Sequence, residues 1–350
     1  MLAGIQLHLP THRACSLPEL VDLARTAADG GVSQVWVTDN LASRNLFVVL
    51  TALAVQVPVR LGSAVLVQFF RNPVDVAGAT AAIAEIMDGR ELSIGMARGN
   101  TRTPGLLDSP KPVTMLRETA RCLRALLAGE AVTMGTYPTL ARYFNMQPGA
   151  SFQLNFTPPG NVRLYCGANG PLGLAVGGAE MDGLVFGGRF QAAARSGKLD
   201  ELMRPFDEAA GKAGKRGLPK VAEIKLSLAR DGRAARQHVR SRAGSRLAGL
   251  TRLGYSAEHI AALGIDVGGF ATLERAVEER RPAREVESLV TDPIIDAMYV
   301  AGDPGECRGR LAEIRKLAEA QGFEQLMFSE LGPDPSESLR LLCGEVLPHL

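Results

Sequence analysis

Hydrophobic and polar residues along the chain follow two alternating periods, one typical of strands and one typical of helices. Residues 2–9 alternate like a strand, and the apolar residues that follow recur at helical spacing. Ser16 predicts the N-cap of that first helix, with Pro18 near its start and Glu19 completing a capping box. The same succession of strand and helix continues through most of the chain, which is typical of a parallel sheet in an α/β fold.

The succession contains eight strand patterns. They are predicted at residues 2–9, 34–38, 60–66 and 91–96, from Leu164 onward, and at 183–186, 223–228 and 325–329. Two segments interrupt it: residues 130–160 predict an irregular or hairpin insertion, and residues 230–290 a long helical excursion. Eight strands with about as many helices favour a single (β/α)8 TIM barrel over residues 1–350, rather than a doubly wound sheet.

Small and polar residues follow the predicted strands at their carboxyl ends. Since these ends meet at one mouth of a TIM barrel, they are the expected place for a site. The residues concerned are Asp39, Asn40, Ala64, Val65, Met96, Ala97, Arg98, Gly167, Ala168, Asn169, Gly170 and Gly187. Asp39 could accept hydrogen bonds from a ligand there, and an ordinary N-cap or loop aspartate is the alternative.

The turn formed by residues 167–170 joins an apolar strand to a helix. Gly170 stands at the predicted N-cap and Pro171 at the first helical position, where its missing N–H costs nothing. Backbone N–H groups at the positive end of a helix dipole form a ready anion site, for which phosphate is the usual ligand. A tight turn that holds nothing is the equally weighted alternative at this point.

Composition excludes several classes of protein. The net charge is +2 and no long basic run occurs, so nucleic acid is not an expected partner, and the arginines between 233 and 246 predict a solvated helix face. Five cysteines without a CxxC pair predict reduced thiols, and the histidines have no metal-ligand spacing. No apolar run reaches membrane-spanning length, so we expect a cytoplasmic protein without a membrane or metal.

The sequence offers no Ser-His-Asp arrangement, no close pair of catalytic carboxylates and no P-loop. A barrel with few acid–base groups and an anion-binding turn suits an enzyme whose cofactor carries the chemistry.

Several stretches together resemble the bacterial-luciferase-like flavin and deazaflavin oxidoreductases, in particular the methylenetetrahydromethanopterin reductase branch. The resemblance covers nearly the whole chain, in the family's order. The matching stretches are residues 30–40, 61–66, 70–73, 88–90, 92–95 and 165–183, with a weaker match at 301–306.

This resemblance implies roles for the residues at the mouth. The third strand would end in a bulge with a non-proline cis peptide bond, Ala64–Val65, pressed against the central ring of the cofactor. Residues 167–170 would bind the cofactor phosphate, and Asp39 would meet the edge of the ring. The fourth loop, residues 96–100, and Gly187 would complete the cofactor site.

Two departures from the family pattern bear on the reaction. Several deazaflavin dehydrogenases have histidine where this chain has Asn40, and an asparagine cannot take up a proton at neutral pH. The fourth loop contains Arg98, where many relatives have a glycine and then an acidic residue. Arg98 could pair with an anionic substrate or cofactor tail, or lie on the surface.

We therefore expect a coenzyme F420-dependent oxidoreductase that transfers a hydride to or from a small organic substrate. Reduction of a C=N or C=C bond fits better than simple alcohol oxidation. An FMN-dependent monooxygenase is the second interpretation, and a non-catalytic flavin-binding protein the third. The resemblance also implies a homodimer, and the chain could depend on a partner flavin or F420 reductase.

Overall fold

Eight parallel strands close into a barrel in the computed structural model, which describes residues 1–9, 12, 14–99 and 106–350. The barrel closes because β9 pairs with β8 on one edge and with β11 on the other. The (β/α)8 TIM barrel predicted from the sequence is therefore confirmed. Its strands are, in order around the barrel, β1 (Leu2–Leu7), β2 (Gln34–Val37), β3 (Arg60–Val67), β4 (Leu92–Ala97), β7 (Val162–Cys166), β8 (Gly183–Phe186), β9 (Lys220–Leu228) and β11 (Gln325–Ser329).

Helices surround the barrel, and two of them begin where the local sequence predicts. Ser16 and Glu19 form the capping box of the first helix, and Gly170 caps α7 with Pro171 after it. Two of the helices, α8 and α9, were not placed by the sequence analysis. The surrounding helices are α1 (Leu17–Asp29), α2 (Leu46–Gln56), α3 (Pro73–Ile86), α5 (Pro112–Leu127), α7 (Pro171–Glu180), α8 (Phe190–Arg195), α9 (Leu199–Lys212), α15 (Pro304–Ala320) and α16 (Pro335–Leu341).

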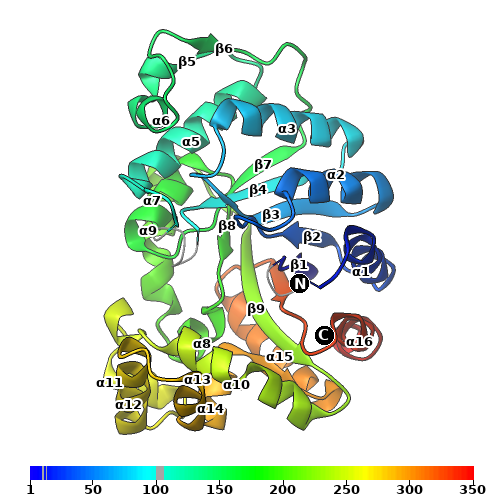
Figure 1. Ribbon diagram of the computed structural model, residues 1–350, viewed down its shortest axis with the longest axis vertical. Helices are drawn as coiled ribbons and strands as arrows, with labels where there is room; N and C mark the ends of the chain where they lie inside the picture. Colours follow the sequence, from blue (N-terminus) through cyan, green and yellow to red (C-terminus); the bar gives the residue numbers. More distant parts are fainter. Residues whose placement is uncertain (10–11, 13, 100–105) are drawn as a thin grey trace.

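The two interruptions of the βα succession form separate structures at opposite ends of the view in Figure 1. In the first, β5 (Val132–Thr133) pairs antiparallel with β6 (Ser151–Phe152), and α6 (Pro138–Tyr143) lies between them in the chain. This is the hairpin insertion that the sequence predicts. The helical excursion contains α10 (Gly232–Leu247), α11 (Ala257–Ala262), α12 (Val267–Glu278), α13 (Ala283–Ser288) and α14 (Asp292–Met298).

Some strand bounds differ from the prediction. The first strand ends at Leu7, two residues early, and β9 begins at Lys220, three residues before the predicted start. A short strand that the sequence did not predict, β10 (Val300–Gly302), pairs with the last three residues of β9. Three residues are too few for a period of two to be recognised, which explains the omission.

The barrel interior is closed by one group of side chains. Trp36, the only tryptophan of the chain, donates a hydrogen bond from Nε1 to Oε1 of Gln325 at 3.0 Å and packs edge to face against Tyr165. Gly62 must lack a side chain, because its Cβ would lie 2.6 Å from the Trp36 ring. The interior residues are Trp36, Ala64, Tyr165, Val185, Val221 and Met327. They fill the barrel as a packed core, so a ligand has to lie beyond them at the mouth.

Candidate active site

The bulge that the sequence predicts lies at the carboxyl end of β3. The peptide bond Ala64–Val65 is cis, and the pairing register with β4 shifts between Ser63 and Leu66. Two hydrogen bonds hold this segment: Gln6 Nε2 donates to the Ala64 carbonyl at 2.7 Å, and Asp39 N donates to the Val65 carbonyl at 3.3 Å. The bulge is thus fixed from β1 and from the end of β2.

Asp39 is buried and connects three parts of the mouth. Its Oδ2 accepts a hydrogen bond from the Val67 backbone N–H at 3.2 Å and pairs with the Arg71 guanidinium at 2.7 Å. Its Oδ1 is buried and has no partner among the residues that the structure describes. A buried carboxylate oxygen without a donor is costly, so this atom is a place where a ligand N–H would be stabilised.

The turn of residues 167–170 supplies fewer free N–H groups than its sequence suggests. Gly167 N already donates to the Met96 carbonyl at 2.8 Å, and Ala168 N to Sγ of Cys166 at 3.4 Å. Within the described parts of the chain no acceptor faces the N–H of Asn169 or Gly170. The anion site is therefore the second half of the turn, together with the first turn of α7.

This turn touches the bulge directly. A Cβ built on Gly167 would lie 2.2 Å from Cγ1 of Val65, so only glycine allows the two segments to meet. On its other side, Oδ1 of Asn169 accepts a hydrogen bond from Gly187 N at 3.3 Å. The predicted phosphate turn, ring-contacting bulge and Gly187 form one continuous surface at the mouth.

The remaining predicted residues take different positions. The side chain of Met96 packs in the main core rather than in the barrel interior, so only its backbone reaches the turn. Ala97 is buried at the end of β4, Asn40 is half-buried, and Arg98 is exposed with no ion pair among the described residues. Asn100, the last residue of the predicted fourth loop, lies outside the residues that the structure describes.

A group of charged and polar side chains opposite the bulge, called here the charged wall, was not predicted from the sequence. Its members are Glu223, Lys225, Ser329 and Glu330. Lys225 Nζ lies 2.9 Å from Oε1 of Glu223 and 3.0 Å from Oε1 of Glu330, and Ser329 Oγ donates to Glu223 at 2.8 Å. Glu223 and Lys225 share the face of β9 that carries the interior residue Val221, so both face the mouth. Two charges at alternate positions in the middle of a largely apolar strand were the available signal.

Glu330 is the centre of this wall. Its side chain is 1% exposed, and it pairs with Arg246 and Arg242 of α10 and accepts from the Tyr299 hydroxyl at 3.0 Å. The backbone around it is left-handed, with φ of 73° at Glu330 and 60° at Leu331. Such conformations are strained for residues other than glycine, and they cluster at functional sites.

Two groups, one in the charged wall and one beside it, have shifted pKa values. The pKa of His8, at the end of β1, is lowered to about 3, first by burial and then by Lys225 and Arg246, with Glu223 opposing them. Burial alone would raise the pKa of Glu223, but Lys225 and Ser329 stabilise its charged form and the pKa is lowered. At neutral pH the charged wall therefore contains an ionised carboxylate and has a neutral imidazole beside it.

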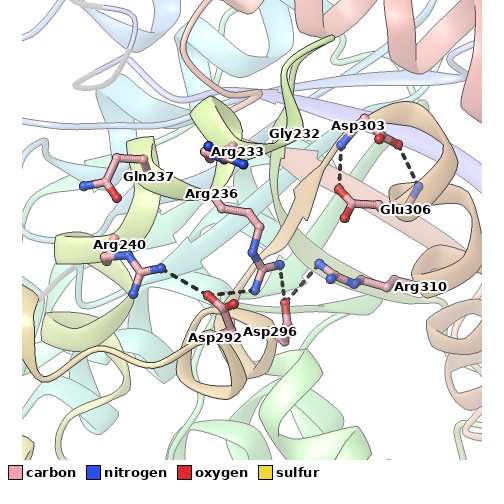
Figure 2. A pocket seen from close by; sticks show the side chains of 10 residues that line it. All are labelled: Gly232, Arg233, Arg236, Gln237, Arg240, Asp292, Asp296, Asp303, Glu306 and Arg310. Atoms are coloured by element: carbon pink, nitrogen blue, oxygen red, sulfur yellow. Dashed lines mark hydrogen bonds and ion pairs between the residues drawn. The ribbon is translucent and has the colours of Figure 1, made fainter.

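A separate polar cavity of about 540 Å³ lies between α10, α14 and α15 (Figure 2). Arg236 pairs with Asp292 and Asp296, Arg240 with Asp292, and Arg310 with Asp296. Its lining contains as many carboxylates as arginines, four of each, so we interpret the cavity as a structural network of ion pairs. The lining residues are Gly232, Arg233, Arg236, Gln237, Arg240, Asp292, Asp296, Asp303, Glu306 and Arg310.

Comparison with known proteins identifies the family. The family model described as luciferase-like monooxygenase matches residues 2–330. The chain belongs to this family.

Two relatives are 5,10-methylenetetrahydromethanopterin reductases. That of Archaeoglobus fulgidus is 28% identical over 342 residues, covering 95% of this chain and 96% of the relative. That of Methanolobus tindarius is 25% identical over 337 residues, covering 94% and 95%. The solved coenzyme F420-dependent tetrahydromethanopterin reductase of Methanopyrus kandleri matches with a TM-score of 0.74 at 21% identity, covering 99% of each chain.

The chain is therefore an enzyme of the luciferase-like family, and its barrel has the same fold as that of the solved relative. All five cysteines are free thiols. Within the described ranges, no helix combines the length and the apolar run that crossing a bilayer requires.

Proposed function

We propose that this protein is a coenzyme F420-dependent oxidoreductase that transfers a hydride between the deazaflavin and a small organic substrate. The observation that supports it most is the direct contact between the turn at Gly167 and the bulge at Val65. A phosphate site beside a surface of small residues suits a flat cofactor with a phosphorylated tail.

The residues at the mouth fit such a cofactor. The N–H groups of Asn169 and Gly170 would hold the phosphate, and Ala64, 6% exposed and without a long side chain, would let the ring approach β3. Oδ1 of Asp39 would accept a hydrogen bond from the ring edge, and Gln6 would keep the bulge in place. Ala97 and Gly187 would leave space on either side of the turn. The bound deazaflavin supplies the hydride chemistry.

The substrate side favours reduction of a C=N or C=C bond. Asn40 can donate or accept a hydrogen bond, which orients a substrate, but its amide is neither an acid nor a base at neutral pH. Burial lowers the pKa of His8 to about 3, so at pH 7 its imidazole is neither a protonated acid nor an effective base. Neither group is a protonated acid. A C=N bond that already carries a positive charge accepts a hydride without a proton, and the stabilised anion left by a conjugated C=C bond can take its proton from water, whereas an alkoxide formed from a carbonyl needs an acid beside it.

An FMN-dependent monooxygenase that uses reduced flavin and oxygen is the second candidate. The description of the matched family, luciferase-like monooxygenase, favours it, and FMN also carries a phosphate that the same turn would bind. A flavin-binding protein without catalysis is the third. We further propose a cytoplasmic homodimer acting on a small molecule, and a partner reductase that supplies the reduced cofactor.

Titration of the apoprotein with F420 and with FMN, followed by absorbance and fluorescence, tests this proposal. We expect F420 to bind and FMN to bind at least about tenfold more weakly. The variant Gly167→Ala places a Cβ against Val65 and should weaken F420 binding by about tenfold or more.

The matched control is Gly160→Ala, because a Cβ there meets no atom within 4 Å. Its affinity for F420 should equal that of the unchanged protein. FMN binding with flavin-dependent oxygen uptake would establish the monooxygenase instead. F420 binding without hydride exchange with any C=N, C=C or C=O substrate would leave the non-catalytic alternative.

A further inference from the structure

Four cations converge at the barrel mouth: Arg189, Lys225, Arg242 and Arg246, called here the cation cluster. Lys225 is on β9, which is four strands from β3 in either direction around the barrel. The cluster therefore faces the bulge at Ala64–Val65 across the mouth. Arg189 follows β8, and Arg242 and Arg246 come from one face of α10, four residues apart.

The cluster has two layers. Lys225, with its side chain 9% exposed, and Glu330, 1% exposed, form the buried layer. Arg242 and Arg246, each 30% exposed, lie over Glu330. Because one buried carboxylate serves three cations, the outer guanidinium groups keep donors that Glu330 cannot satisfy.

Arg189 adds a cation without a carboxylate. Its Nε and Nη2 donate to the backbone carbonyl of Arg246 at 3.3 and 3.0 Å, which joins it to the outer layer. No described carboxylate lies within ion-pair distance of Arg189, and burial lowers its pKa. A half-buried guanidinium whose partner is a neutral carbonyl is stabilised by any anion that reaches it.

The charges of the site are therefore unequal. Four cations face two carboxylates, Glu223 and Glu330, whereas the lining of the cavity in Figure 2 has four arginines and four carboxylates. We propose that the cation cluster binds a carboxylate or phosphate group of the substrate, with Arg189, Arg242 and Arg246 as the contacting residues. This inference rests on the proposed function and adds the substrate class: an anionic molecule whose reactive bond lies toward the bulge.

Glu330 acts in this arrangement as a positioning residue. It holds Arg246 and Tyr299 on one side and Lys225 on the other, and the left-handed backbone at 330–331 directs it beneath the arginines. Guanidinium groups recognise carboxylate and phosphate by paired N–H donors, which explains why arginine rather than lysine forms the outer layer.

The test measures binding of inorganic phosphate to F420-loaded protein by calorimetry, so that the turn at 167–170 is already occupied. Arg189→Gln and Arg242→Gln should each weaken phosphate binding by about tenfold or more. Arg242 contacts Glu330 at 3.4 Å and donates to the His238 carbonyl at 3.1 Å, so its replacement leaves the pairs of Glu330 with Lys225 and Arg246 in place. The control is Arg233→Gln, an exposed arginine at the other end of α10, which should bind phosphate as the unchanged protein does.

Affinity for F420 is measured on the same variants. An unchanged F420 affinity with weakened phosphate binding supports the proposal. Phosphate binding that is absent, or unaffected in both variants, overturns it, and so does a parallel loss of F420 affinity, since the anion would then belong to the cofactor tail. Should the unchanged protein fail to bind F420, the proposed function fails. The effect of the arginine variants on phosphate binding is then measured on the apoprotein.

Discussion

Single residues at the mouth act mainly by fixing the backbone of their neighbours. Gln6 and Asp39 reach the bulge from other strands, through hydrogen bonds that span 58 residues in one case. Oδ2 of Asp39 binds Val67 and Arg71, whereas Oδ1 has no partner among the described residues. One oxygen therefore holds the end of β3 in place, and the other remains available to a ligand. The site is thus preorganised by hydrogen bonds between segments at the ends of neighbouring strands.

Buried histidines predict a dependence of stability on pH. His12 is 1% exposed, and burial lowers its pKa to about 4, below the unfolded value near 6.5. The unfolded state therefore binds more protons between these values, so the free energy of unfolding is highest above pH 6.5 and falls as the pH drops toward 4. The titration of His12 lowers the free energy of unfolding by at most about 3 kcal/mol. Urea titrations at pH 7.5 and 4.5 should show a smaller loss in His12→Leu.

The exposed His349 provides the control, since His349→Leu should keep the full dependence on pH. An equal loss in His12→Leu and in the unchanged protein would show that the imidazole of residue 12 does not cause it.

Elements with local signals were predictable, and contacts between distant elements were not. Capping residues at Ser16 and Gly170 mark two helix starts, and both are confirmed as N-caps. The charged residues around Glu330 come from β9, β11 and α10, and the contact of Glu330 with Lys225 links residues 105 positions apart in the chain. No local period reveals such a contact, so the bulge and phosphate turn were predicted from motifs whereas the cation cluster was not.

The exposed face of α2 supports the predicted homodimer. This helix contains no charged residue, and Val48 and Val55 are 56% and 68% exposed. Burying such a face against a second copy would be favourable. The double variant Val48→Glu, Val55→Glu should be monomeric in sedimentation velocity, while Leu253→Glu, at an exposed leucine elsewhere, should not alter the mass. A monomeric unchanged protein would contradict the prediction.

At the scale of the whole molecule, the barrel and the helical excursion have distinct cores that share elements. The core of the excursion includes Ala192 of α8 and Ala301 of β10, and β10 pairs with β9 of the barrel. In Figure 1 the helices of the excursion lie beside α8 and α15, so the excursion is not a separate body joined by a linker alone. Contacts of this kind favour one cooperative unit over residues 1–350, which stays a prediction from the sequence.

Urea unfolding tests that prediction with two probes. Trp36, the only tryptophan, lies inside the barrel and reports on it by fluorescence, while far-ultraviolet circular dichroism follows all helices, including those of the excursion. Because the two cores share α8 and β10, we expect both probes to give the same midpoint and slope. A dichroism transition that precedes the loss of Trp36 fluorescence would mean that the excursion unfolds by itself. The cation cluster, which takes two arginines from α10, would then be lost before the barrel.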